Sequence, residues 1–149
     1  MKLQTATVIK TLEELDGEAQ AFIAGLSPRD DGATLVTLSG ELGAGKTAFV
    51  KAVAKAFGIK EVVTSPTFVL EKIYKVGHPM SNFGRLVHID ACRLESGADL
   101  KPLGFDELMK DSENLILLEW PEKVGLDGSA TLHFTFAANS DGTHTVTYG

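Results

Sequence analysis

The stretch GELGAGKT, residues 40–47, is the part of the sequence that decides the fold. The apolar run TLVTLS at residues 34–39 comes directly before it, and AFVKAVAKAFG at residues 48–58 follows it. The first run is short and apolar, which favours a buried central strand, and the second keeps the spacing of an amphipathic helix. The stretch itself matches G-x-x-x-x-G-K-[ST], the P-loop pattern, which requires this order of strand, loop and helix. A plain glycine turn before a helix is the alternative interpretation.

A loop of this kind binds phosphate groups. Its glycines let backbone N–H groups turn toward phosphate oxygens, and the N-terminus of the helix adds the positive end of its dipole. Lys46 is expected to reach the β- and γ-phosphates, and the hydroxyl of Thr47 is expected to ligate Mg²⁺. The stretch therefore predicts a binding site for a nucleoside triphosphate. The residues expected to form it are Glu41, Leu42, Gly43, Ala44, Gly45, Lys46, Thr47 and Ala48.

Two elements are predicted before the loop. Residues 5–10 predict a short edge strand, and Thr11 with Glu14 fits a capping box at the start of a helix. The apolar residues of that helix keep helical spacing, and they are Leu12, Leu15, Ala19, Phe22, Ile23 and Leu26.

The pattern changes after the second helix. Residues 67–76 and 84–92 predict two strands, and their short connection favours an antiparallel pair. Residues 104–111 predict a short helix, and residues 114–120 predict another buried strand. Alternation through residues 130–148 predicts a terminal hairpin around an NSDG turn. We therefore expect an α/β fold of the P-loop NTPase type, with a mixed parallel and antiparallel sheet and flanking helices.

Length and charge bound the class of protein. The length predicts a single domain over residues 1–149, and no window approaches the roughly 20 apolar residues of a membrane span. With 20 acidic and 14 basic residues, the chain lacks the positive charge that binding to a nucleic acid backbone requires. We expect another protein to hold any nucleic acid that it serves. Charges interrupt the N-terminal segment where a signal peptide needs an apolar core, which favours a cytoplasmic protein.

Two carboxylates lie where apolar strands end. Asp90 is near the end of LVHIDA, and Glu119 is at the end of NLILLE. A phosphate-binding loop needs an acidic partner for the metal and a group that positions the attacking molecule. Such an acid can also be only a solvated strand end or a helix cap. The neighbouring P-loop makes both residues candidates for metal binding or catalysis.

Five motifs together resemble the TsaE family, formerly called YjeE, over about residues 10 to 125. In order along the chain, they are GELGAGKT, VTSPTFVL, HIDACRL, LGFDELM and LLEWPEK. The family is the bacterial ATPase of tRNA threonylcarbamoyladenosine biosynthesis. The resemblance implies a Mg²⁺-dependent ATPase, weak without partners, that acts on a complex of TsaD-like and TsaB-like proteins. In that complex the partners modify the adenosine beside the anticodon, so the chain meets tRNA only indirectly.

The resemblance also implies roles for individual residues. Lys46 becomes the catalytic phosphate lysine, and ATP becomes the expected nucleotide. Thr47 and Asp90 become Mg²⁺ ligands, directly or through water. Glu119 becomes the catalytic residue that orients the hydrolytic water.

Other matched positions are less specific by themselves. Ser65, Pro66 and Thr67 match a switch-like loop of the family, which implies contact with the γ-phosphate or a partner; an ordinary Ser-Pro turn is the alternative. Trp120 matches the EW motif, which implies a place beside the nucleotide, although a lone tryptophan more often serves packing. Arg93 matches an arginine that steadies the loop or faces phosphate or a partner, and a surface salt bridge is the alternative.

The chain departs from the family at Cys92, where tyrosine is usual, so any hydrogen bond of the phenol is lost. No motif activates this single cysteine as a nucleophile, and we expect a buried small side chain. The histidines lack metal-ligand spacing, so no zinc site is predicted; they are His78, His88, His133 and His144.

Two other functions stay open. A small-molecule P-loop kinase needs further cations over the transferred phosphoryl group, whereas the only arginines are Arg29, Arg85 and Arg93. A nucleotide-dependent binding module without turnover has little use for Glu119. Production of ADP and phosphate, alone or with partners, distinguishes these functions from an ATPase.

Overall fold

The computed structural model describes residues 5–41, 43–61, 70–77 and 82–149. One seven-stranded sheet runs through them in the order β1-β7-β6-β2-β5-β4-β3. The strands are β1 Thr5–Ile9, β2 Thr34–Gly40, β3 Glu71–Lys75, β4 Arg85–Asp90, β5 Asn114–Glu119, β6 Leu132–Ala138 and β7 His144–Tyr148. The α-helices are α1 Leu12–Ala24, α2 Lys46–Ala56 and α3 Phe105–Met109, and the 3₁₀ helices are η1 Gly97–Leu103 and η2 Pro121–Val124.

Both strand orientations occur in the sheet. The neighbours β6, β2, β5 and β4 are parallel, whereas β3 pairs with β4, β7 with β6 and β1 with β7 in antiparallel register. This confirms the mixed α/β sheet, the edge position of β1, the central position of β2 and the terminal hairpin. Because parallel strands end at the same edge of a sheet, β2, β4 and β5 bring the residues that follow them close together.

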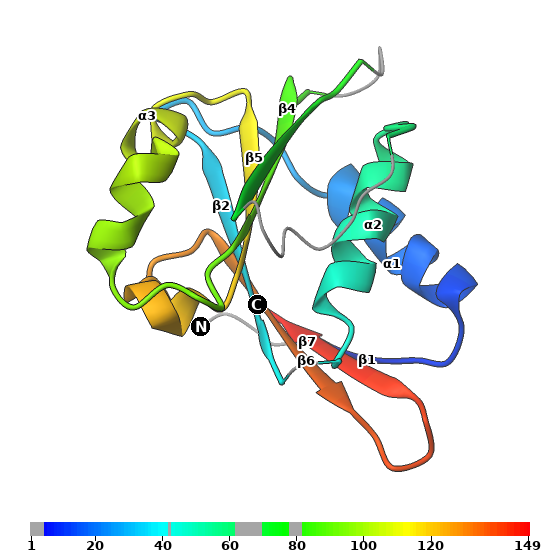
Figure 1. Cartoon of the computed structure of the whole chain (residues 1–149). Helices are drawn as coiled ribbons and strands as arrows, with labels where there is room; N and C mark the ends of the chain where they lie inside the picture. The colour runs from blue at the N-terminus through cyan, green and yellow to red at the C-terminus, as the bar shows by residue number, and fades with distance from the viewer. Residues whose placement is uncertain (1–4, 42, 62–69, 78–81) are drawn as a thin grey trace.

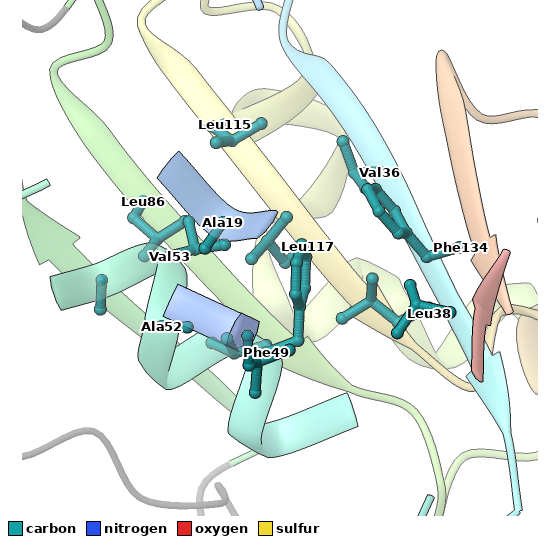
Figure 2. Close-up of a cluster of buried hydrophobic side chains, with 14 of the residues drawn as sticks. Ala19, Val36, Leu38, Phe49, Ala52, Val53, Leu86, Leu115, Leu117 and Phe134 are labelled. Atoms are coloured by element: carbon teal, nitrogen blue, oxygen red, sulfur yellow. The ribbon is translucent and has the colours of Figure 1, made fainter. Parts of the chain in front are cut away.

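Helices cover both faces of the sheet, with α1 and α2 on one side and α3 on the other (Figure 1). Because both faces of the sheet are covered, the side chains on both faces of strand β5 are buried. Leu115 and Leu117 pack with α1 and α2, whereas Ile116 and Leu118 belong to the cluster on the side of α3. A strand that is buried on both faces reads as a continuous apolar run. Figure 2 shows Phe49 of α2 directed at the sheet beside Leu117.

The start of α1 differs from the prediction. The side chain of Thr11 accepts a hydrogen bond from the Glu14 N–H at 3.1 Å, as a cap should. The Glu14 carboxylate, however, accepts from the Lys10 N–H at 2.6 Å instead of from Thr11, so the capping box is displaced by one residue. Leu12 is 74% exposed, because the helix turns its first residue away from the sheet. The two 3₁₀ helices were not predicted.

Gly40 is the position where the end of β2 tolerates no side chain. Its φ is +145°, and an added Cβ would lie 2.4 Å from the backbone oxygen of Phe136 on β6. We expect Gly40→Ala to lower the free energy of unfolding by about 2–4 kcal/mol, through backbone strain and crowding together.

The matched control is Gly17→Ala within α1, where an added Cβ meets nothing within 4 Å. Removing a helical glycine is expected to stabilise the protein by about 0.5–1 kcal/mol. Urea denaturation measures both variants. A Gly40→Ala protein as stable as the wild type would contradict the close approach of β2 and β6.

Candidate functional site

The strand register places the two predicted carboxylates beside each other. Asp90 ends β4 and pairs with Glu119, which ends β5, while Glu119 pairs with Leu38 of the P-loop strand on its other side. Side chains two residues apart share a face, so Glu119 follows Leu117 onto the side of α2. Both carboxylates therefore lie next to the loop between β2 and α2.

A cavity of about 300 Å³ lies at this junction. Its lining contains most of the predicted site residues and one that was not predicted, Cys92. The lining residues are Gly43, Gly45, Lys46, Thr47, Ala48, Asp90, Cys92, Glu119 and Trp120.

The remaining predicted residues have other places. Glu41 is exposed, and its backbone oxygen contacts Lys46, while Ala44 lines a neighbouring cavity. Leu42 and the segment with Ser65, Pro66 and Thr67 lie outside the described residues.

Two glycines of the loop line the cavity and have backbone conformations that favour glycine. Gly43 and Gly45 have left-handed φ values of +80° and +109°, and an added Cβ at Gly43 would meet nothing within 4 Å. Gly45 is the N-cap of α2, and no side-chain hydrogen bond caps that helix. Its first-turn N–H groups are thus available to an anion, and the helix dipole favours one there.

Lys46 is buried at the base of this loop, with only 5% of its surface exposed. Its Nζ donates to the backbone oxygens of Gly40 and, at 3.5 Å, of Glu41, and it lies 3.7 Å from the centroid of the Trp120 ring. Burial lowers the pKa of Lys46, and the nearby carboxylates, Glu119 first, oppose that shift. An anion in the cavity would restore favourable interactions to this desolvated ammonium.

Glu119 is the most buried acid of the site, at 2% exposure. The hydroxyl of Thr47 lies 3.4 Å from each of its carboxylate oxygens. The Nε2 of His88, on the adjacent strand β4, lies 2.5 Å from Glu119 Oε2. No functional role was predicted for His88, although its position two residues before Asp90 on a predicted strand already places both on one face.

Asp90 is partly buried at the end of β4, and its Oδ1 accepts a hydrogen bond from the Cys92 N–H at 3.0 Å. Burial raises the pKa of Asp90, while the Cys92 hydrogen bond lowers it and the charge of Glu119 raises it. A cation beside Asp90 would favour its ionised form.

Trp120 is the only non-glycine residue with a positive φ, +60°, in the part of the chain that the structure describes. Its N–H donates to the Leu38 oxygen at 3.1 Å, and Pro121 then begins η2. A left-handed tryptophan costs backbone free energy, and such strain gathers at functional sites. The strained turn places the indole ring over Lys46, as expected for a residue beside the loop.

The expectation that Cys92 is buried is wrong, because its side chain is exposed. Strand β4 ends at Asp90, and the backbone turns there to bring the Cys92 N–H onto the Asp90 carboxylate. The thiol therefore lies in the turn, at the wall of the cavity. Arg93, the next residue, is also exposed.

Two of the three arginines are engaged far from the loop. Arg85 begins β4, at the sheet edge opposite Asp90, where it pairs with Asp111 and donates to the Asn114 side chain at 2.7 Å. Arg29 pairs with Asp31 at 3.1 Å. Neither arginine lines the cavity.

A second cavity, of about 200 Å³, adjoins the loop on the side of α1 and β7. Gly45 and Ala48 are in the linings of both cavities, which therefore adjoin at the end of the loop and the first turn of α2. The second is mainly apolar, with Leu15, Phe136 and Val146 in its lining.

Within the described ranges, no group of three or more His, Cys, Asp or Glu side chains is arranged to hold a metal ion. Among the helices in the same ranges, none combines the length and apolar character needed to cross a membrane.

Comparison with known proteins gives a consistent result. Residues 9–146 match the family described as threonylcarbamoyl adenosine biosynthesis protein TsaE. The chain is 37% identical over 123 residues to the tRNA threonylcarbamoyladenosine biosynthesis protein TsaE of Rickettsia bellii, covering 82% of this chain and 78% of that protein. It is 44% identical over 90 residues to the Streptomyces coelicolor protein of that name, covering 59% of this chain and 57% of the relative.

A solved structure agrees with these relatives. The crystal structure of YdiB from Bacillus subtilis superposes with a TM-score of 0.73 at 26% identity, over 99% of this chain and 86% of that one. The P-loop junction described above thus lies in a fold that is shared over the whole chain. The chain belongs to the TsaE family and has its role in the biosynthesis of threonylcarbamoyladenosine in tRNA.

Proposed function

We propose that the chain binds MgATP at the P-loop junction and hydrolyses it slowly, as a step in tRNA threonylcarbamoyladenosine biosynthesis. One observation carries this proposal: a buried lysine, a hydroxyl and two carboxylates line one cavity at an uncapped helix N-terminus. These are Lys46, Thr47, Asp90 and Glu119. In this arrangement Lys46 and the loop N–H groups bind the phosphates, since each offers a donor to an anion.

The oxygen donors of the site fit Mg²⁺. This ion prefers hard oxygen ligands and uses one or two carboxylates together with water and substrate phosphates, so a cage of three acidic residues is not required. Thr47 and Asp90 would hold it, since the hydroxyl and the carboxylate line the same cavity. When bound, Mg²⁺ supplies charge neutralisation at the phosphate oxygens.

Glu119 is the residue that we assign to the hydrolytic water. Its carboxylate is buried, adjoins Asp90 in the sheet register and still lines the cavity. A carboxylate that is held in place by neighbours can accept a proton from water or orient it without first reorganising. The position of Glu119 therefore favours hydrolysis of ATP over binding without turnover.

We propose that the base of the nucleotide lies on the other side of the loop. The second cavity is mainly apolar and shares Gly45 and Ala48 with the lining of the first, which suits a flat aromatic base joined to phosphates at the loop. Lys46 does not contribute to recognition of the base, since it lines the first cavity and not the second.

We further propose that TsaD-like and TsaB-like proteins complete the site, and that tRNA is met only through that complex. The support is a shortage of cations. Lys46 is the only lysine or arginine in the lining of the first cavity, as far as the described residues show. Phosphoryl transfer gains about 10³- to 10⁵-fold from an added arginine. A protein with so few cations at the site benefits from a partner that supplies one.

Calorimetric titration tests the binding part of the proposal. MgATP should bind to one site per chain, and inorganic tripolyphosphate should bind at least about tenfold more weakly, since it leaves the apolar cavity empty. Phosphate release measured on the same sample should be slow but above background. A protein that binds neither ligand would contradict the assignment of the loop, and equal affinities would contradict the place of the base.

A further inference from the structure

His88 is a completely buried imidazole that the proposed reaction does not yet use. It is 0% exposed on β4, beside Leu117 of β5 and Lys72 of β3 in the sheet register. Its Nε2 lies 2.5 Å from Oε2 of Glu119, which is itself 2% exposed. Two polar side chains at this depth are costly to bury unless each satisfies the other, so this contact is a specific feature of the site.

The other ring nitrogen identifies the direction of the hydrogen bond. The Nδ1 of His88 has no hydrogen-bond partner among the described residues. A proton on Nδ1 would be a buried donor without an acceptor, while Nε2 would then face the carboxylate without a proton between them. The tautomer with its proton on Nε2 avoids both costs. His88 therefore donates and Glu119 accepts.

The contact restrains the carboxylate that faces the cavity. Among the described residues, the other polar contact of the Glu119 carboxylate is the Thr47 hydroxyl, at 3.4 Å from either oxygen, which is too long to select one carboxylate orientation. The short bond from His88 fixes Oε2 against β4. Oε1 is left with lone pairs that can serve a water molecule.

We propose that His88 is a positioning residue that holds the Glu119 carboxylate in the orientation needed for hydrolysis. This inference rests on the proposed ATPase activity and adds a residue to it. His88 itself touches neither nucleotide nor water; it acts through Glu119. Misplacing a catalytic group by about 1 Å can cost up to about 100-fold in rate, which sets the size of the expected effect.

Two substitutions separate positioning from packing. Glutamine at position 88 can place an amide N–H close to the place of Nε2, whereas asparagine is shorter and cannot reach Glu119. We expect His88→Asn to lower the rate of ATP hydrolysis by about 10- to 100-fold with an unchanged Kd for ATP, and His88→Gln to recover most of that rate. His133→Asn is the control, because His133 contacts the Thr37 hydroxyl and lies outside the cavity lining.

The double variant gives a readout that a packing role would not move. If His88 acts through Glu119, His88→Asn should cause no further loss of rate in a Glu119→Gln protein. Nitrogen-15 NMR of the imidazole reports the tautomer independently of hydrolysis. The wild type should show the proton of His88 on Nε2, and urea denaturation checks that each variant is folded.

Three results would overturn the inference: wild-type hydrolysis by folded His88→Asn, an equal loss of rate with and without the Glu119 carboxylate, or a proton on Nδ1. If the wild type releases no phosphate even with its partners, the proposed ATPase function itself fails, and the role of His88 in hydrolysis fails with it. That outcome is distinguishable, because the wild type and every variant are then equally inactive.

Discussion

Lys46→Ala is expected to weaken ATP binding by at least about 100-fold, because the change removes the one side-chain cation in the described lining of the P-loop cavity. The backbone N–H groups remain and leave residual affinity. Burial lowers the pKa of Lys46, because the ammonium loses solvation in the folded protein, and this loss offsets the contacts that it makes there. Stability without nucleotide should therefore change little.

Lys51→Ala is the control for this change, since Lys51 is exposed on the same helix. Calorimetric titration with MgATP measures both variants. Equal affinity of wild type and Lys46→Ala, in a folded protein, would exclude the loop as the phosphate site.

Glu119→Gln is expected to slow hydrolysis by about 100-fold or more while ATP affinity stays within a few-fold of the wild type. Glutamine keeps the size of the side chain and an oxygen that can accept from His88, but it cannot take a proton from water. Single-turnover measurement of ADP formation isolates the chemical step from binding.

Asp90→Asn is the matched comparison, because the paired residue at the end of β4 is assigned to Mg²⁺. Its effect should appear as a weaker dependence of ATP binding on Mg²⁺. Hydrolysis by Glu119→Gln at the wild-type rate would transfer the role to another residue or to a partner.

The sequence predicted the architecture of the site because its main parts follow from local patterns. A glycine-rich loop between a buried strand and a helix has few other structural explanations, and parallel strands bring their following residues to one edge. Asp90 and Glu119 could therefore be placed near Lys46 before any contact was known. The roles that these residues perform remain proposals.

The details that the sequence missed depend on tertiary contacts. The bond between His88 and Glu119 joins two strands through their register, which a single sequence does not specify. The left-handed turn at Trp120 goes against the preference of a bulky residue for negative φ. Cys92 was expected to be buried because small apolar residues usually are, but a turn after β4 exposes it.

The central claim is that this protein is a slow ATPase that its partners complete. Steady-state phosphate release, with and without cognate TsaD-like and TsaB-like proteins, tests it most directly, together with pull-down in ATP and in ADP. We predict turnover well under about 1 s⁻¹ for the protein alone, below the enzyme median near 10 s⁻¹, and at least tenfold stimulation in a complex that forms with ATP. Two results would contradict this account, provided that no nucleotide-dependent complex forms. Fast turnover by the protein without partners would favour a free hydrolase, and product that appears only with a small-molecule acceptor would favour a kinase.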